Sequence, residues 1–318
     1  MRIWLVPDPE SPNGDDAFCR EIARGAVARG HVAVISPTIS GALPGDLVLV
    51  NRFQSEPLRL ARAAGCKTAI RFIDSYPGAD AEALNEVRGL TLAADRVLVP
   101  NLHLATLVKS WGANGQVRQV PYAYDKIPAQ AIAMVTVRAS RSSFPVVCCS
   151  SFDRAALPGL ETLVLAVSRL RLGCHLFLIG EGPGELALKE RVRQLAITDK
   201  VSFLGKLPHQ KTLEYIRASK AYIDPCGLEG FPTMGLYALA EGCPVIAAKA
   251  GALTELIQDR VNGMMFNHGS PASLCEAIVT LWSVRGLSLR LIEEGIRTIS
   301  NHSWEHTVQA VFEALEDL

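Results

Sequence analysis

Glu229 begins the stretch whose residue types are best suited to chemistry, residues 229–247, EGFPTMGLYALAEGCPVIA. It lies on a turn between a predicted strand and a predicted helix, and Gly230 follows it. A glycine turn that leads into a helix presents unpaired backbone N–H groups, which bind anions. A neighbouring carboxylate is well placed to accept hydrogen bonds from hydroxyl groups. The stretch therefore predicts a ligand with a diphosphate and hydroxyl groups, such as a nucleotide sugar. The alternative is a generic strand–helix turn in which Glu229 only begins the helix.

Short apolar stretches alternate with helical patterns along most of the chain, which predicts α/β layers with parallel sheets. The first series of expected strands is 2–6, 31–36, 46–51, 67–73, 96–100 and 117–121. The second series is 145–151, 175–180, 200–205, 221–226 and 244–249. Residues 126–144, rich in Ser, Ala and Arg, are the expected linker. Two such series predict two Rossmann-like domains, in which ligands bind at the C-terminal ends of the strands.

Composition narrows the class of protein. The length of 318 residues is enough for two domains, and the counts of Lys+Arg and Asp+Glu are both 32, so no net charge favours nucleic acid or an anionic membrane. The apolar run before Pro7 is too short for a signal peptide, and no run approaches the roughly 18 apolar residues of a membrane span. The eight cysteines lack metal-binding spacing, so we expect reduced thiols in a cytoplasmic protein and no metal site.

The stretch that begins at Glu229 resembles the signature of the retaining GT-B glycosyltransferases of the group-1, family 4-like type. The matching residues are Glu229, Gly230, Phe231, Gly242, Pro244, Val245 and Ile246. Residues 12–31, 93–125, 178–232 and 251–266 resemble other parts of that family in the same order. The resemblance implies an α/β fold of the GT-B type, with two Rossmann-like domains facing across a cleft and a C-terminal helix crossing back to the N-terminal domain. On this basis we place an N-terminal acceptor-side domain at 1–135, a nucleotide-sugar-binding domain at 136–300 and the C-terminal helix at 301–318.

Tyr237 is the first departure from the family pattern, because it stands where the family has a second glutamate. That glutamate accepts hydrogen bonds from ribose hydroxyls, whereas a phenol has one oxygen and makes a weaker version of the contact or stacks on the sugar. A Tyr237 packed against the domain core is the alternative. Glu241 lies one helical turn further on the same face, away from the helix start, and is not expected to substitute.

The second departure concerns the diphosphate, which the family holds with an Arg and a Lys before a glycine. If Gly159 is that glycine, Pro158 stands at the Lys position and Asp153 at the Arg position. Arg154 is one step away and is the remaining candidate, with a solvated loop charge as the alternative. The loss of the Lys predicts weaker diphosphate binding, or a replacement by Lys206 or Arg71.

The resemblance implies further substrate-binding residues, which are Asn13 and Gly14 in an N-terminal loop, Gly205, Lys206, Leu207 and His209 near the base, and Gly230, Phe231, Pro232 and Thr233 at the signature turn. Asp74 is expected to act with Glu229 at the catalytic centre, because family members often have a His or Asp there. A helix N-cap is the alternative for Asp74. The loop GEGPGE at 180–185 lacks the third glycine of a dinucleotide fingerprint, because Glu185 stands there.

The function implied by the resemblance is a retaining glycosyltransferase that moves a sugar from a nucleotide diphosphate sugar to a hydroxyl acceptor in glycan or glycoconjugate biosynthesis. No cofactor or metal is implied beyond the donor substrate. The expected partners are the nucleotide sugar and an acceptor that is a glycan, a lipid-linked molecule or a small molecule. No nucleic acid is expected, and peripheral membrane contact stays open. The missing Lys and Tyr237 leave an alternative, a catalytically inactive GT-B protein that binds nucleotide, glycan or a protein partner. The donor base, the sugar, the acceptor and the oligomeric state are not indicated.

Overall fold

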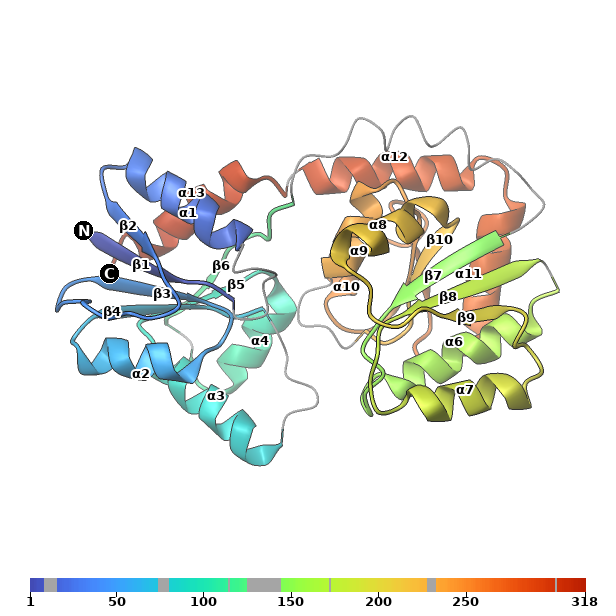
Figure 1. The fold of residues 1–318 in the computed structure, drawn as a ribbon. Coiled ribbons are helices and arrows are strands. Elements are labelled where there is room, and N and C mark those ends of the chain that lie inside the picture. The colour runs from blue at the N-terminus through green and yellow to red at the C-terminus, as the bar shows by residue number, and fades with distance from the viewer. Residues whose placement is uncertain are drawn as a thin grey trace. The chain divides into compact units, whose positions relative to one another are not determined.

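Two compact units make up the chain in the computed structural model, which describes residues 1–8, 16–73, 80–113, 115–124, 144–171, 173–227, 233–300 and 302–318. The first unit comprises Met1–Ala123 and His302–Leu318, and the second comprises Tyr124–Asn301 (Figure 1). Each unit contains a six-stranded parallel sheet with helices on it, as the alternating sequence pattern predicts. The domain boundary expected at residue 135 lies outside the described residues.

The sheet of the first unit has the order β2-β1-β3-β4-β5-β6, with all strands parallel. Its strands are β1 (Arg2–Val6), β2 (Val32–Ile35), β3 (Leu47–Asn51), β4 (Lys67–Arg71), β5 (Arg96–Val99) and β6 (Val117–Gln119). Its helices are α1 (Ala17–Ala28), α2 (Ser55–Ala63), α3 (Ala81–Ala93), α4 (Leu102–Ser110) and α13 (Trp304–Leu315). The strands β3 and β5 are buried along their whole length because helices cover both faces of the sheet.

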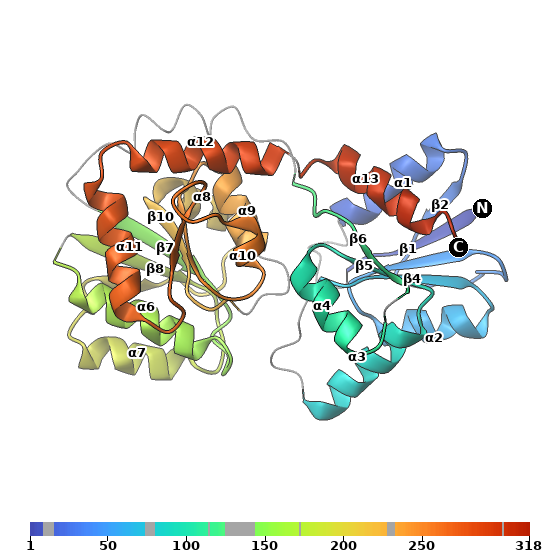
Figure 2. The same cartoon turned by 180° about the vertical axis from the view of Figure 1, so that it is seen from behind.

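Helix α13, from the C-terminal end of the chain, packs on the first unit beside α1, as Figure 2 shows from behind. Arg96 on β5 donates from Nε to the carbonyl of Ala314 at 2.9 Å, and the Thr307 hydroxyl donates to the carbonyl of Pro121 at 2.7 Å. Helices α2, α3 and α4 cover the opposite face of the same sheet. The first unit is therefore completed by residues more than 180 positions away in the sequence.

The sheet of the second unit has the order β12-β11-β10-β7-β8-β9, also parallel throughout. Its strands are β7 (Phe144–Cys149), β8 (Cys174–Ile179), β9 (Val201–Phe203), β10 (Ala221–Asp224), β11 (Val245–Ala248) and β12 (Met264–Phe266). Its helices are α6 (Leu157–Arg169), α7 (Glu185–Gln194), α8 (His209–Ala218), α9 (Thr233–Ala240), α10 (Leu253–Leu256), α11 (Pro271–Ser283) and α12 (Leu287–Ser300). The sequence pattern did not predict the short strand β12.

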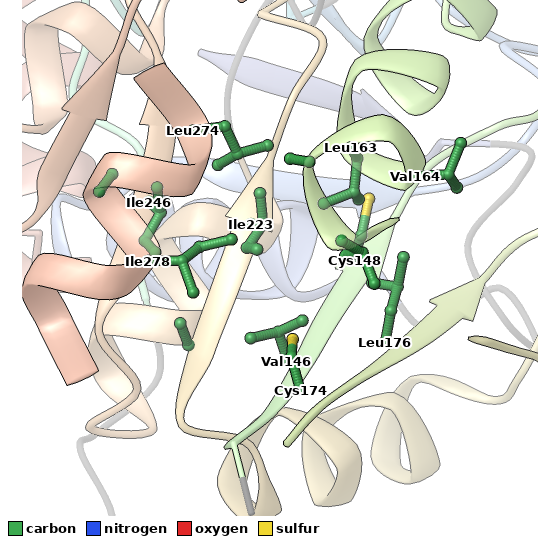
Figure 3. Close-up of a cluster of buried hydrophobic side chains, with 14 of the residues drawn as sticks. Val146, Cys148, Leu163, Val164, Cys174, Leu176, Ile223, Ile246, Leu274 and Ile278 are labelled. Atoms are coloured by element: carbon green, nitrogen blue, oxygen red, sulfur yellow. The ribbon is translucent and has the colours of Figure 1, made fainter. Parts of the chain in front are cut away.

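Apolar side chains from the strands and from two helices form the core of the second unit. Val146 and Cys148 on β7 lie beside Leu176 on β8, while Leu163 on α6 and Ile278 on α11 cover them (Figure 3). All five side chains are at most 1 % exposed. Because this core fixes β7, β8 and β10, it also fixes where the loops that follow those strands begin.

No single helix among the described residues is long and apolar enough to cross a membrane. One bent pair of helical segments reaches the length and apolar composition of a membrane span only when its two parts are taken together, and these parts are Pro271–Ser283 and Leu287–Leu315.

The contact between α1 and α13 gives a first prediction. A Cβ atom at Gly25 would overlap a methyl group of Val308 and lie 3.1 Å from the Phe312 ring, so Gly25→Ala should lower the free energy of unfolding by about 1–3 kcal/mol. Gly89 on α3 has no atom within 4 Å of such a Cβ, so Gly89→Ala should be neutral or stabilising by about 0.5–1 kcal/mol. Urea unfolding of both variants checks this, and equal stability of the two would contradict the described packing.

Candidate functional site

The order of the second sheet reverses between β7 and β10, the two central strands from which the chain runs outward in opposite directions. Ligands of open parallel sheets bind outside the carboxyl ends of the strands at such a point. Residues 150–156 follow β7 at this edge, and residues 225–227 follow β10. The signature turn that contains Glu229 continues from the latter, although residues 228–232 lie outside the described residues.

Backbone segments meet directly on the β7 side of this edge. The N–H of Phe152 donates to the carbonyl of Glu181 at 3.0 Å, and the N–H of Gly184 donates to the carbonyl of Phe152 at 2.7 Å. A Cβ at Gly182, where φ is +156°, would lie 2.7 Å from the Phe152 carbonyl carbon. Gly182 therefore serves a close backbone-to-backbone contact.

Asp224 fixes the turn that leads toward Glu229. It is buried at the end of β10, and its Oδ1 accepts from the N–H groups of Cys226 at 3.0 Å and Gly227 at 3.2 Å. Burial raises the pKa of Asp224, while the two backbone donors oppose that rise. Sequence reasoning missed this residue, although an Asp that ends the apolar strand 221–224 was visible in the sequence.

Glycines on both sides hold the same turn. A Cβ at Gly159, in the first turn of α6, would lie 2.7 Å from the carbonyl oxygen of Pro225. A Cβ at Gly227, where φ is +62°, would lie 2.7 Å from the Cβ of Ala250, in the loop after β11. The turn after β10 is thus fixed against the start of α6 and the loop after β11.

Tyr237 lies half-buried on α9, between two other aromatic rings. Its ring centroid is 4.9 Å from that of Tyr124 and 4.6 Å from that of His209, with edge-on geometry in both pairs. Loss of water around the imidazole lowers the pKa of His209, and the carboxylate of Glu241 opposes that shift. The structure therefore brings together two of the predicted binding residues, Tyr237 and His209, and adds Tyr124, which was not predicted.

Glu241 lies directly behind these rings and is 1 % exposed. Its carboxylate accepts from Nε and Nη2 of Arg217 on α8, and from the Tyr124 hydroxyl at 3.4 Å. Hydrogen bonding to Glu241 raises the pKa of Arg217, and burial, followed by the Glu241 charge, raises the pKa of Tyr124. The Glu241 carboxylate is thus engaged by the protein itself.

The candidate cations for the diphosphate have different surroundings. Arg154 is exposed on the loop before α6. In the same loop, the Asp153 carboxylate accepts from the N–H of Ala156 at 2.8 Å and from the Ser151 hydroxyl at 2.7 Å, so it organises the start of the helix. The Lys206 ammonium lies 4.0 Å from the Glu181 carboxylate, with both side chains exposed.

The other predicted site residues are distributed as follows. Gly205 has a φ of +67° in the loop after β9, Leu207 is half-buried in that loop, and Thr233 is the first residue of α9. Seven predicted residues lie outside the described residues: Asn13, Gly14, Asp74, Glu229, Gly230, Phe231 and Pro232. Within the described ranges, no group of three or more His, Cys, Asp and Glu side chains is arranged to hold a metal ion.

Comparison with known protein families shows which proteins this part of the chain is similar to. Residues 143–283 match the family model of glycosyl transferases group 1. A D-inositol 3-phosphate glycosyltransferase of Acidothermus cellulolyticus is 29 % identical over 153 residues, which are 46 % of this chain and 34 % of that protein. An uncharacterized glycosyltransferase of Methanocaldococcus jannaschii is 26 % identical over 163 residues, 50 % of this chain and 45 % of that protein. The matches thus span between a third and a half of the length of these two relatives.

Solved structures match over the whole chain. Sucrose-phosphate synthase from Thermosynechococcus elongatus has a TM-score of 0.77 at 18 % identity, covering 100 % of this chain and 98 % of that one. Anabaena HepE in complex with UDP and glucose has a TM-score of 0.78 at 16 % identity, covering 100 % of both chains. The expected fold class is confirmed: this is a GT-B protein. Its residues 143–283, less than half of the chain, are similar to the group-1 glycosyltransferases.

The aromatic contacts of Tyr237 give a second prediction. Tyr237→Glu removes both edge-on contacts and puts a second carboxylate four residues before the buried Glu241, so it should lower the free energy of unfolding by about 1–3 kcal/mol. Tyr237→Phe keeps the ring and should change stability by less than about 1 kcal/mol. Thermal unfolding with and without UDP measures both effects. An unchanged melting temperature together with tighter UDP binding in Tyr237→Glu would show instead that this side chain faces the ribose.

Proposed function

We propose that this protein is a retaining glycosyltransferase that moves a sugar from a nucleotide diphosphate sugar to a hydroxyl acceptor in glycan or glycoconjugate biosynthesis. The observation that carries the proposal is the coincidence of three features at one sheet edge. The strand order reverses there, a fixed turn leads into the signature at Glu229, and the family match covers the same residues. The expected partners are the donor and an acceptor that is a glycan, a lipid-linked molecule or a small molecule.

A uridine diphosphate sugar is the donor that we propose first. HepE, which shares the fold over its full length, has been solved with UDP and with UDP-glucose. In this chain the base would lie against residues 205–209, with the rings of His209 and Tyr237 beside the ribose. A phenol in place of a carboxylate offers the ribose one oxygen, so we expect the nucleoside to be held partly by ring contacts.

The proposed reaction mechanism follows from the group on which charge develops, which is the leaving diphosphate. As the bond between the sugar and the diphosphate breaks, negative charge grows on the leaving diphosphate, and we propose that the N–H groups of Gly230 and Phe231 stabilise it. Arg154 and Lys206 are the cations that we assign to the same group. Because these groups carry the charge, we propose that the reaction needs neither a metal nor a cofactor.

Glu229 and Asp74 are the proposed catalytic residues. Glu229 would hold hydroxyl groups of the transferred sugar, and Asp74 would contact the same sugar. The acceptor would then attack on the face that the diphosphate leaves, with a diphosphate oxygen taking its proton. The anomeric configuration is retained in this way without a protein nucleophile.

We place the protein in the cytoplasm, which agrees with its eight free thiols, six of them buried.

A catalytically inactive protein that binds a nucleotide, a glycan or a protein partner is the second candidate. The packing of Tyr237 against Tyr124 and His209, together with Pro158 at the position of the family's Lys, favours it. Turnover of a nucleotide sugar decides between the two candidates.

Glu229→Gln gives the third prediction. It keeps the shape of the side chain and removes the charge, so kcat/KM for the donor sugar should fall by the equivalent of about 2–4 kcal/mol of transition-state stabilisation. Affinity for UDP alone should not change, because UDP has no sugar for Glu229 to hold. Hydrolysis of UDP-sugars in the absence of acceptor provides the assay.

Glu214→Gln is the matched control, because Glu214 pairs with the exposed Lys211 on the surface of α8. Its turnover should equal that of the wild type. If Glu229→Gln retained full turnover, the chemistry would not depend on Glu229, and if the wild type turned over no nucleotide sugar, the binding protein would be the better account.

A further inference from the structure

A network of buried polar side chains lies at the C-terminal edge of the first sheet. The order of this sheet reverses between β1 and β3, and ligands of open parallel sheets bind at such a point. Asn51 ends β3 and is paired in register with Arg71, which ends β4. Asp16, at the start of α1, completes the network. These three side chains are between 4 % and 7 % exposed.

Asn51 lies between the Arg71 guanidinium and the Asp16 carboxylate and forms a hydrogen bond with each of them. Nη1 of Arg71 donates to Oδ1 of Asn51 at 2.9 Å, and Nδ2 of Asn51 donates to Asp16. This orientation of the amide is forced, because a guanidinium only donates and a carboxylate only accepts. Asp16 also accepts from the N–H of Cys19 at 3.1 Å and of Asp8 at 2.8 Å, so three donors already occupy its carboxylate.

Arg71 is therefore a buried cation whose direct hydrogen-bond partner is a neutral amide. Its guanidinium carbon lies 4.1 Å from the Phe18 ring centroid and 4.7 Å from that of Tyr122, which provides cation–π contacts. In the described part of the chain, no Asp or Glu forms an ion pair with Arg71, and no acceptor is found for its Nε or Nη2.

A charge that is removed from water needs a partner of opposite charge to offset the desolvation. The nearby Arg52 differs in this respect, since its guanidinium lies 3.7 Å from the Asp8 carboxylate. The remaining edge of Arg71, with Nε and Nη2 in a fixed plane, matches the two oxygens of a phosphate or carboxylate.

We propose that Arg71 is a binding residue for an oxyanion, a phosphate or a carboxylate, carried by the acceptor substrate on the first unit. Phe18, Tyr122 and Asn51 hold the guanidinium in place, and the anion accepts from its remaining N–H groups. Assignment of the anion to the acceptor rests on the proposed transferase function, whereas the anion site itself does not. Acceptors that bear a phosphate or carboxylate should accordingly be preferred to their uncharged analogues.

Calorimetry with inorganic phosphate, glucose 6-phosphate and glucose at constant ionic strength tests the site without any assay of transfer. The wild type should bind phosphate in a saturable manner and glucose 6-phosphate more tightly, and it should show no binding of glucose. Arg71→Met should weaken glucose 6-phosphate binding at least tenfold, and Arg71→Lys, which keeps the charge but loses the planar fork, should have intermediate affinity. Lys67→Met, at the exposed opposite end of β4, should bind as the wild type does.

Two results would overturn the proposal: no saturable phosphate binding by the wild type, or equal binding by the wild type and Arg71→Met. Phosphate binding without tighter glucose 6-phosphate binding would show a site for free anions and would overturn the assignment to the acceptor. If Arg71→Met does not fold, the comparison of Arg71→Lys with Lys67→Met decides. UDP affinity measured on the same variants reports separately on the proposed donor site and should not change.

Discussion

The close approach of backbone segments at the C-terminal edge of the second sheet is the constraint on which the site of that unit depends. The turn after β10 lies against the start of α6 and against the loop after β11, at distances that leave no room for a side chain. The Asp224 carboxylate closes the turn from inside by binding two of its N–H groups. Gly159 and Gly227 are therefore required by packing, because they let the turn after β10 approach the beginning of α6 and the loop after β11.

The two units differ in the hydrogen-bond partners of their buried charged side chains. In the second unit, Glu241 and Arg217 form a direct pair with two hydrogen bonds, which engage both oxygens of the carboxylate. In the first unit, Asn51 stands between Arg71 and Asp16, so the hydrogen-bond partner of the guanidinium among the described residues is a neutral amide. The direct Arg217–Glu241 pair fixes α8 against the end of α9. The amide of Asn51, in contrast, orients the Arg71 guanidinium without neutralising its charge, so the guanidinium can still pair with an anion. We therefore assign a structural role to the Glu241–Arg217 pair and a binding role to Arg71.

The fold could be predicted from the sequence because the pattern that indicates each strand or helix lies within one short stretch of residues. Apolar runs such as 2–6 and 46–51 are short, are separated by helical patterns and are buried on both faces, so each is readable by itself. The strand β12 was not predicted because its apolar run, Met264–Phe266, is only three residues long and is bounded by Gly263 and Asn267, whereas the equally short β6 and β9 lie within the longer predicted stretches 117–121 and 200–205. The family resemblance, confirmed by the match over 143–283, supplied the GT-B class.

The surroundings of the site residues could not be predicted in the same way, because they arise from contacts between residues distant in sequence. Tyr237 meets Tyr124 and His209 only after the helices have packed, and the sequence left both a ribose contact and a core position open for it. Likewise, Arg71 appeared as a spare cation for the diphosphate. The structure adds that Phe18, Tyr122 and Asn51 contact its guanidinium, a network that no local pattern indicates.

The central claim is that the β7–β10 edge of the second unit binds a nucleoside diphosphate, with contacts weakened by the loss of the Lys and of the second glutamate. Calorimetry of the wild-type protein with uridine, guanosine and adenosine diphosphates tests it most directly. The account predicts saturable binding of at least one of them, with a Kd in the micromolar to millimolar range. Absence of binding for all three would contradict the site, and nanomolar affinity for any of them would contradict the weakened contacts.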